Sequence, residues 1–150
     1  MTATITITNP ILCGMNPDPS WIWDDEFQRI VLVTSTFELV PGLPIYVSED
    51  MTCWKHVSNV VDADLARRLL IPFVDDSGGV YAPTLRRIHG KYVIACTIAR
   101  LDDRRAMEGG CTESELMRFH AAEGNFILEA DSIEGPWHGP FWIEGAEGID

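Results

Sequence analysis

One aspartate near the start of the chain stands in a setting that suits catalysis. Asp18 lies between Pro17 and Pro19, and each proline restricts the backbone on its own side of the carboxylate. By itself, such a segment is typical of a turn that leads into a strand. A carboxylate held in this way can also take a proton from water, as a general base does. A turn and a catalytic base are therefore both open interpretations of Asp18.

A second carboxylate of interest is Asp150, which stands 132 residues later. Two carboxylates that enter one pocket from different parts of a fold suit acid and base catalysis on a glycosidic bond. Whether Asp18 and Asp150 can meet depends on the elements that carry them.

Most of these elements are predicted to be short strands separated by turn residues. They form two groups of four: residues 20–23, 29–36, 45–48 and 54–57, then residues 84–88, 91–98, 125–130 and 137–143. Pro19-Ser20 opens the first group and Pro83-Thr84 opens the second, 64 residues later, while Thr34 matches Thr97 at nearly the same offset. Four antiparallel strands in roughly 40 residues is the size of one propeller blade. We therefore predict an all-β chain built from β-propeller blades.

The segments between the strands have a different character. Residues 63–70 show helical spacing of their leucines, and residues 75–79 are expected to form a loop. A polar insertion at residues 101–124 interrupts the second group of strands. Within it, Thr112 and Glu115 fit a helix capping box, which predicts a short helix.

The repeat bears directly on the two carboxylates. In a propeller, the innermost strand of each blade lines the central channel. Asp18 comes just before the first strand of the first group, and Asp150 holds the equivalent place in an expected third repeat. The repeat therefore directs both carboxylates to one central pocket and favours the catalytic interpretation of Asp18.

Charge and hydropathy exclude several classes of partner. The net charge of −12 argues against binding to nucleic acid and to an anionic membrane surface. No apolar run approaches the roughly 18 residues of a membrane helix. Residues 1–8 alternate polar and apolar side chains and are expected to form a strand or a leader before the domain. They lack the basic and apolar regions of a secretory signal, which favours a cytoplasmic location, with secretion as the alternative if the true N-terminus differs.

Metal and disulfide sites are not indicated by the spacing of cysteines and histidines. There is no C-x-x-C pair, and no histidine has metal-ligand spacing. We expect free thiols in a reducing compartment, no metal and no organic cofactor. The four cysteines concerned are Cys13, Cys53, Cys96 and Cys111.

Several segments resemble, in the same order, the family 43 glycoside hydrolases and especially their β-xylosidase branch. They are residues 9–20, with Asn16-Pro17-Asp18-Pro19 inside, and residues 34–50, 79–86, 125–131, 133–137 and 148–150. Gly148-Ile149-Asp150 looks like the start of the family's Gly-Ile-Asp-Pro motif. The resemblance implies a five-bladed β-propeller. Residues 9–150 would be its incomplete N-terminal part, with about two blades and the start of a third.

The resemblance also implies roles for particular residues. Asp18 matches the general base that activates water, and Asp150 matches a second carboxylate that orients the acid and tunes its pKa. The family's general acid, a glutamate from a later blade, has no match in this chain. Phe37 and the segment Tyr81-Ala82-Pro83 match residues of the sugar pocket, with Tyr81 where the family usually has Trp. From the residues alone, Phe37 is equally well explained as a core aromatic at the end of a strand.

The function implied is that of an inverting glycosidase of xylan-derived oligosaccharides. Its bond would be β-1,4-xylosidic or α-L-arabinofuranosidic, and its partner a xylo-oligosaccharide or an arabinoxylan-derived sugar. Two other classes stay open: a catalytically inactive truncated propeller that still binds sugar, and a protein-binding platform. The missing glutamate favours the first of these, whereas carboxylates at the axis speak against the second. Because blades bury their faces only against neighbouring blades, two uncovered faces are also expected.

Overall fold

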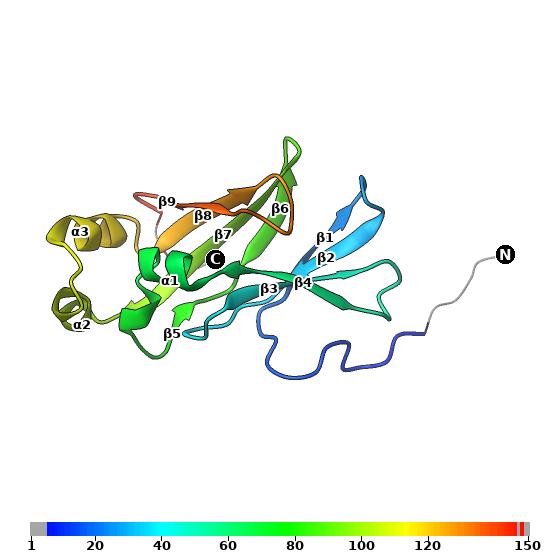
Figure 1. Cartoon of the computed structure of the whole chain (residues 1–150), viewed down its shortest axis with the longest axis horizontal. Helices are drawn as coiled ribbons and strands as arrows, with labels where there is room; N and C mark the ends of the chain where they lie inside the picture. Colours follow the sequence, from blue (N-terminus) through cyan, green and yellow to red (C-terminus); the bar gives the residue numbers. More distant parts are fainter. Residues whose placement is uncertain (1–5, 147, 149–150) are drawn as a thin grey trace.

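Two antiparallel sheets lie side by side in the computed structural model, which describes residues 6–146 and 148 (Figure 1). The first sheet, here blade 1, has the strand order β1-β2-β3-β4. Its strands are β1 (Ser20–Asp24), β2 (Arg29–Val33), β3 (Gly42–Ser48) and β4 (Lys55–Val61). Each strand pairs with the one before it along the chain, as the repeat predicts.

The second sheet, here blade 2, is built around one long strand. Its order is β5-β7-β8-β9, and β6 also pairs with β7. The strands are β5 (Val74–Val80), β6 (Thr84–Ile88), β7 (Lys91–Leu101), β8 (Asn125–Ala130) and β9 (His138–Trp142). The prediction of an all-β chain with two four-stranded units is confirmed, with β5 as an added strand.

Short helices fill the connections. The link between the blades contains α1 (Ala63–Arg68) and the 3-10 turn η1 (Ile71–Phe73), and the insertion in blade 2 contains α2 (Asp103–Glu108) and α3 (Glu113–Ala121). The predicted capping box is present: Glu115 N donates to Thr112 Oγ1 at 3.2 Å, and Thr112 N donates to Glu115 Oε2 at 2.7 Å. Figure 1 shows α2 and α3 at the end of the molecule away from blade 1.

The prediction of a loop at residues 75–79 was wrong, because these residues belong to β5. The strand has a register shift between Val74 and Gly79, so its polar, glycine-rich sequence forms a bulge within the sheet. Gly79 has φ +97°, and a Cβ there would lie 2.3 Å from the carbonyl oxygen of Phe37. Glycine at this position therefore permits the two backbones to pair.

Several strand boundaries also differ from those predicted. The second predicted strand continued to Thr36, but β2 ends at Val33, because Ser35 N donates to the carbonyl of Pro17 at 3.0 Å instead of to a sheet neighbour. Trp54 precedes β4, and its Nε1 donates to the Met51 carbonyl at 3.1 Å. These changes leave the number and order of the predicted strands intact.

The pairing register refines the internal repeat. Ser20 lies opposite Val33 in blade 1, and Thr84 lies opposite Ala95 in blade 2. Counting two residues onward, Ser35 corresponds to Thr97. The predicted match of Thr34 with Thr97 was therefore wrong by one residue.

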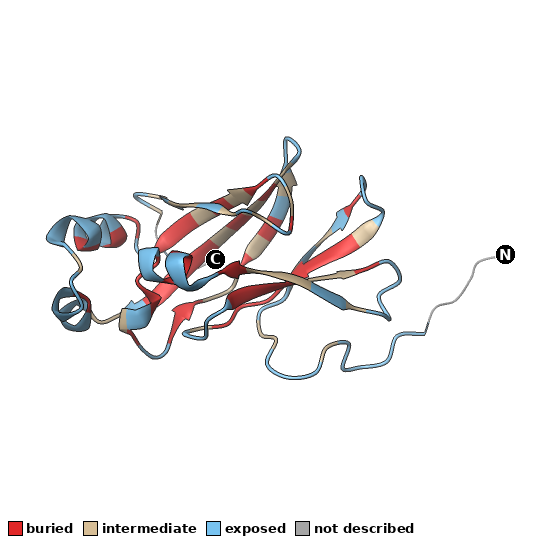
Figure 2. Ribbon diagram, in the orientation of Figure 1, coloured by how far each residue is buried: buried red, intermediate tan, exposed pale blue. Residues whose placement is uncertain are grey.

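The two blades share one hydrophobic core (Figure 2). Buried side chains of blade 1, such as Val31 and Ile45, belong to the same cluster as Leu85, Ile94 and Phe126 of blade 2. Ser58 Oγ in β4 donates to the Ile133 carbonyl at 2.6 Å, and Leu85 N in β6 donates to Ser20 Oγ at 3.0 Å. These contacts make the pair of blades one packed unit.

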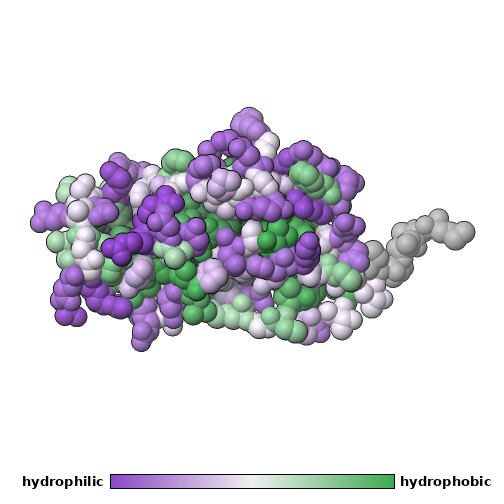
Figure 3. All heavy atoms as spheres, in the orientation of Figure 1, coloured by the Kyte–Doolittle hydropathy of each residue, from purple (hydrophilic) through white to green (hydrophobic). Residues whose placement is uncertain are grey.

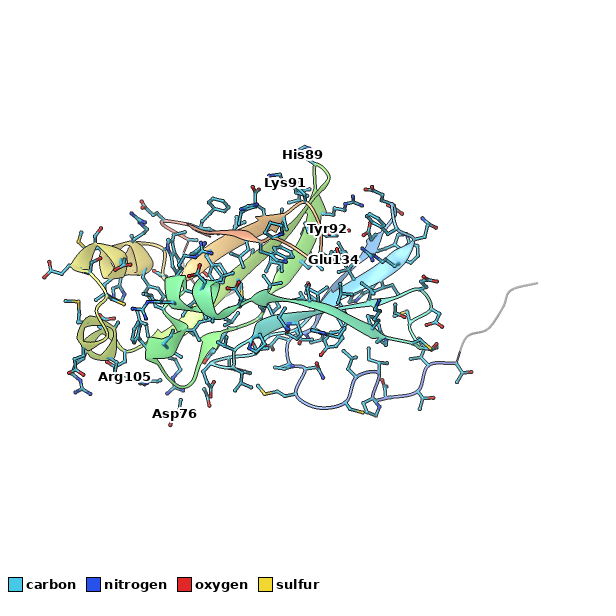
Figure 4. All side chains as sticks on the ribbon, in the orientation of Figure 1. Asp76, His89, Lys91, Tyr92, Arg105 and Glu134 are labelled. Carbon is cyan, nitrogen blue, oxygen red and sulfur yellow. The ribbon has the colours of Figure 1, made fainter. Side chains whose placement is uncertain are left out.

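A buried carboxylate also ties the blades together. Asp24, at the end of β1, is fully buried and accepts a hydrogen bond from Arg87 Nη1 at 2.6 Å. Tyr92 Oη donates to the other oxygen of the same carboxylate. Figure 4 labels Tyr92 on the part of blade 2 nearest blade 1. Because a buried carboxylate needs partners, this contact specifies how the two blades dock.

The surface mixes hydrophilic and hydrophobic residues (Figure 3). On blade 1, Trp21 and Trp23 are 56% and 44% exposed, which agrees with the expected uncovered blade face. Within residues 6–146 and 148, no helix is long and apolar enough to cross a membrane.

Candidate active site

Asp18 lies at the end of blade 1 where the chain enters the sheet, two residues before β1 begins. Its backbone has φ +49°, a left-handed conformation that costs an L-residue about 1–2 kcal/mol but that Asp tolerates better than most. The residue is exposed, and its Oδ2 accepts a hydrogen bond of 2.6 Å from Ser35 Oγ. The carboxylate is thus accessible at the surface, and the hydroxyl of the buried Ser35 fixes one of its oxygens.

Phe37 and Tyr81 meet across the two blades. Their ring centroids are 5.3 Å apart and their planes are inclined by 71°, the edge-to-face geometry that aromatic pairs favour. Beneath the rings, Phe37 N donates to the Val80 carbonyl at 3.0 Å, and Val80 N donates to the Phe37 carbonyl at 2.9 Å. Both side chains are half-buried, so each presents part of its ring to the surface. Phe37 therefore packs against Tyr81, and its contact with a sugar stays a prediction.

The remaining two residues of the predicted sugar pocket lie just before β6. Ala82 is half-buried and Pro83 is buried. Ala82 lines a cavity of about 150 Å³, together with polar residues of β7 and β8, Thr97 and Asn125. Gly148 also lines this cavity. The structure thus brings the C-terminal segment beside Ala82.

Asn125 secures that C-terminal segment. Its Nδ2 donates to the carbonyls of Ala146 at 3.0 Å and Gly148 at 2.9 Å, and its Oδ1 accepts from Thr97 Oγ1. Asn125 is only 9% exposed, so its amide hydrogens and oxygen are used inside the protein. Asp150 lies outside the described residues, and its meeting with Asp18 stays a prediction.

Sequence reasoning missed Ser35, Thr97 and Asn125. Ser35 lies within the family-like segment 34–50, but a small polar residue after a strand does not stand out. The signal that finds it is the register, which makes Ser35 and Thr97 equivalent. Both are buried, and each donates its hydroxyl to a polar side chain at the same end of its blade.

Other candidate ligands lie apart from these residues. The four histidines are exposed, and the side chain of His120 contacts that of Asp103 in α2 at 2.9 Å. Figure 4 places His89 at the tip of the β6–β7 turn. Among residues 6–146 and 148, no group of three His, Cys, Asp or Glu side chains could hold a metal.

The described cysteines include free thiols and one residue that supports the backbone near the site. Cys13, Cys53 and Cys111 are free thiols, and burial raises the pKa of the Cys111 thiol above its ordinary value. Cys96 donates its thiol hydrogen to the Tyr81 carbonyl at 2.9 Å. It thereby supports the backbone beneath the aromatic pair.

The sequence of the chain matches a known protein family. The model of the family "Glycosyl hydrolases family 43" matches residues 7–150. The chain is 36% identical over 140 residues to the non-reducing end α-L-arabinofuranosidase BoGH43B of Bacteroides ovatus, covering 92% of this chain and 22% of that protein. It is 35% identical over 149 residues to a xylan 1,3-β-xylosidase of a Vibrio species, covering 98% of this chain and 24% of that protein.

Solved structures give the same result. The crystal structure of a xylan β-1,4-xylosidase from Bacillus halodurans superposes with a TM-score of 0.67 at 29% identity, covering 91% of this chain and 23% of that one. This likeness confirms the propeller fold class predicted from the strand repeat. The chain spans about a quarter of the length of the relatives that it matches.

Proposed function

Because the chain belongs to glycosyl hydrolases family 43, we propose that its full-length gene product is an inverting glycosidase of xylan-derived oligosaccharides. The terminal sugar removed would be β-1,4-linked xylose, with α-L-arabinofuranose as the alternative. Relatives with both kinds of activity in their names support this choice of substrates.

The observation that carries the proposal is the arrangement around Asp18. An exposed carboxylate, whose Oδ2 accepts a hydrogen bond from the buried Ser35 hydroxyl, precedes β1. Phe37 follows β2 at the same end of blade 1, because Ser20 pairs with Val33, and it contacts Tyr81 there. Ring faces and edges of aromatic residues suit the apolar faces of a pyranose, and a carboxylate suits an attacking water.

The chemistry follows from which oxygen of Asp18 is engaged. Ser35 holds Oδ2, so Oδ1 is left to accept a proton from water. The water oxygen then attacks the anomeric carbon as the glycosidic C–O bond breaks, and the configuration inverts. A general acid must protonate the leaving oxygen. The family assigns that step to a glutamate, which this chain would obtain from another part of the full-length protein.

The proposal is tested with the full-length gene product and two aryl glycosides, an aryl β-xyloside and an aryl α-L-arabinofuranoside. We expect turnover of the xyloside, and proton NMR of the first product should show the α-anomer, because inversion changes the configuration of a β-glycoside. Initial release of the β-anomer would contradict the single-displacement mechanism. Turnover of the arabinofuranoside alone would move the specificity to the alternative sugar.

A second candidate function is sugar binding without turnover by these 150 residues alone. It is favoured by one observation, namely that both aromatic residues of the predicted sugar pocket lie together in this chain. We expect chemical-shift changes at Phe37 and Tyr81 when xylobiose is added to the chain. The absence of any shift at saturating xylobiose would rule the candidate out.

A further inference from the structure

Ser35 makes hydrogen bonds to the segment that carries the candidate base, Asp18. Its side chain is fully buried, and its Oγ donates to Asp18 Oδ2 at 2.6 Å. Its backbone N–H donates to the carbonyl of Pro17, the residue just before Asp18, at 3.0 Å. One residue therefore fixes both the backbone and the carboxylate of the Asp18 segment.

The position of Ser35 depends on the way β2 ends. Residues 34–36 are buried but leave the sheet, because the Ser35 N–H turns toward Pro17. A buried hydroxyl has a strong need for a hydrogen-bond partner. Among the described residues, the partner it finds is the Asp18 carboxylate. The Asp18 carboxylate thus accepts a hydrogen bond from a donor that is shielded from solvent.

The equivalent residue of blade 2 also uses its hydroxyl to bind a polar side chain. Thr97 is two residues beyond Ala95, as Ser35 is two residues beyond Val33. Its hydroxyl donates to the amide oxygen of Asn125, whose Nδ2 donates to the Gly148 carbonyl. The same position in both blades therefore anchors a polar group at the same end of the molecule. In blade 1 that group is an exposed carboxylate.

We propose that Ser35 is the positioning residue for the general base of this enzyme. This inference rests on the proposed function, in which Asp18 is that base. Ser35 holds one carboxylate oxygen, and thereby sets the direction in which the other oxygen meets the attacking water. The left-handed backbone at Asp18 makes such an anchor necessary, because a strained residue keeps its geometry only when its surroundings fix it.

The test compares Ser35→Ala, Asp18→Ala and the double variant in the full-length gene product. A 2,4-dinitrophenyl β-xyloside is the substrate, because its leaving group needs no acid and residual turnover stays measurable. We expect Ser35→Ala to lower kcat about 10- to 100-fold, the effect of losing one hydrogen bond to a charged group. KM should stay within about twofold, because Ser35 does not touch the sugar in this account. In the Asp18→Ala background, Ser35→Ala should have no further effect on kcat, because it acts through that carboxylate.

Ser58→Ala is the matched control. Ser58 Oγ also makes a hydrogen bond of 2.6 Å, but to the Ile133 carbonyl between the blades. It should lower the melting temperature and leave kcat unchanged.

The outcomes separate the two proposals. If Asp18→Ala keeps wild-type kcat, the proposed function fails and the role of Ser35 fails with it. If Asp18→Ala is impaired and Ser35→Ala is not, only the role of Ser35 is overturned. That role is also overturned if Ser35→Ala lowers kcat equally with and without Asp18.

Discussion

At the residue scale, the site is defined by strained positions that the surrounding structure holds. Asp18 and Phe37 both have left-handed backbones, with φ +49° and +53°, although neither is glycine. Each such residue costs about 1–3 kcal/mol and persists only where its neighbours over-determine it. Hydrogen bonds to the Ser35 segment hold Asp18, and a backbone pair with Val80 holds Phe37. In both residues, contacts of the surrounding structure offset the cost of the left-handed backbone.

Tyr92 allows a pH-dependent test of the contact between the blades. Burial, first, and then the hydrogen bond to Asp24 raise the pKa of Tyr92 above its ordinary value of 10. The neutral phenol is therefore favoured in the folded chain. Its contribution to stability is complete below pH 10, and is lost as the pH rises through the raised pKa.

We predict that Tyr92→Phe removes this alkaline loss and also lowers the free energy of unfolding at pH 7 by about 1.5–3 kcal/mol. Urea unfolding at a series of pH values measures both effects. Tyr46→Phe is the control, since Tyr46 is only half-buried on β3 and should leave the alkaline loss in place. An unchanged alkaline slope in Tyr92→Phe would contradict the assignment.

At the element scale, the way each strand begins or ends determines which side chains lie at the site. The ends of β2 and β5 carry Ser35, Phe37 and Tyr81, and the start of β8 carries Asn125. None of these positions follows from the alternation of polar and apolar residues. They depend on hydrogen bonds that leave the regular ladders.

Asn125 gives a prediction for one of these ends. Asn125→Ala removes the two hydrogen bonds donated to the Ala146 and Gly148 carbonyls and leaves the Thr97 hydroxyl without its acceptor. We expect the backbone amides of Gly145 and Ala146 to exchange with deuterium about tenfold faster or more. Asn59→Ala is the control, because the Asn59 side chain makes a hydrogen bond with the exposed His56 on β4, away from the C-terminal segment. Equal exchange in the two variants would show that Asn125 does not hold this segment.

Local pattern predicted the elements well and their boundaries less well. The strands, the linking helix and the capping box at Thr112 follow from alternation, turn residues and capping chemistry, which are short-range properties. The strand at residues 74–80 was missed because its polar, glycine-rich sequence looks like a loop. It becomes a strand only through pairing with β7 and with Phe37. Likewise, Asp18 was found from its prolines, whereas Ser35 required the register of two strands.

At the scale of the whole molecule, two blades form one packed unit with a shared core and a polar contact through Asp24. Asp18 lies just before β1, and the Phe37–Tyr81 pair lies beyond the ends of β2 and β5. The chain spans about a quarter of the length of the relatives that it matches.

Asp18 is the base of the proposed glycosidase, and the decisive measurement is kcat of Asp18→Ala in the full-length gene product. On an aryl β-xyloside, removal of a general base should lower kcat by about 10²- to 10⁴-fold. Circular dichroism and the melting temperature should stay close to those of the wild type, because Asp18 is exposed and, among the described residues, its side chain bonds only to Ser35. Turnover near the wild-type rate in a folded Asp18→Ala protein would contradict the account.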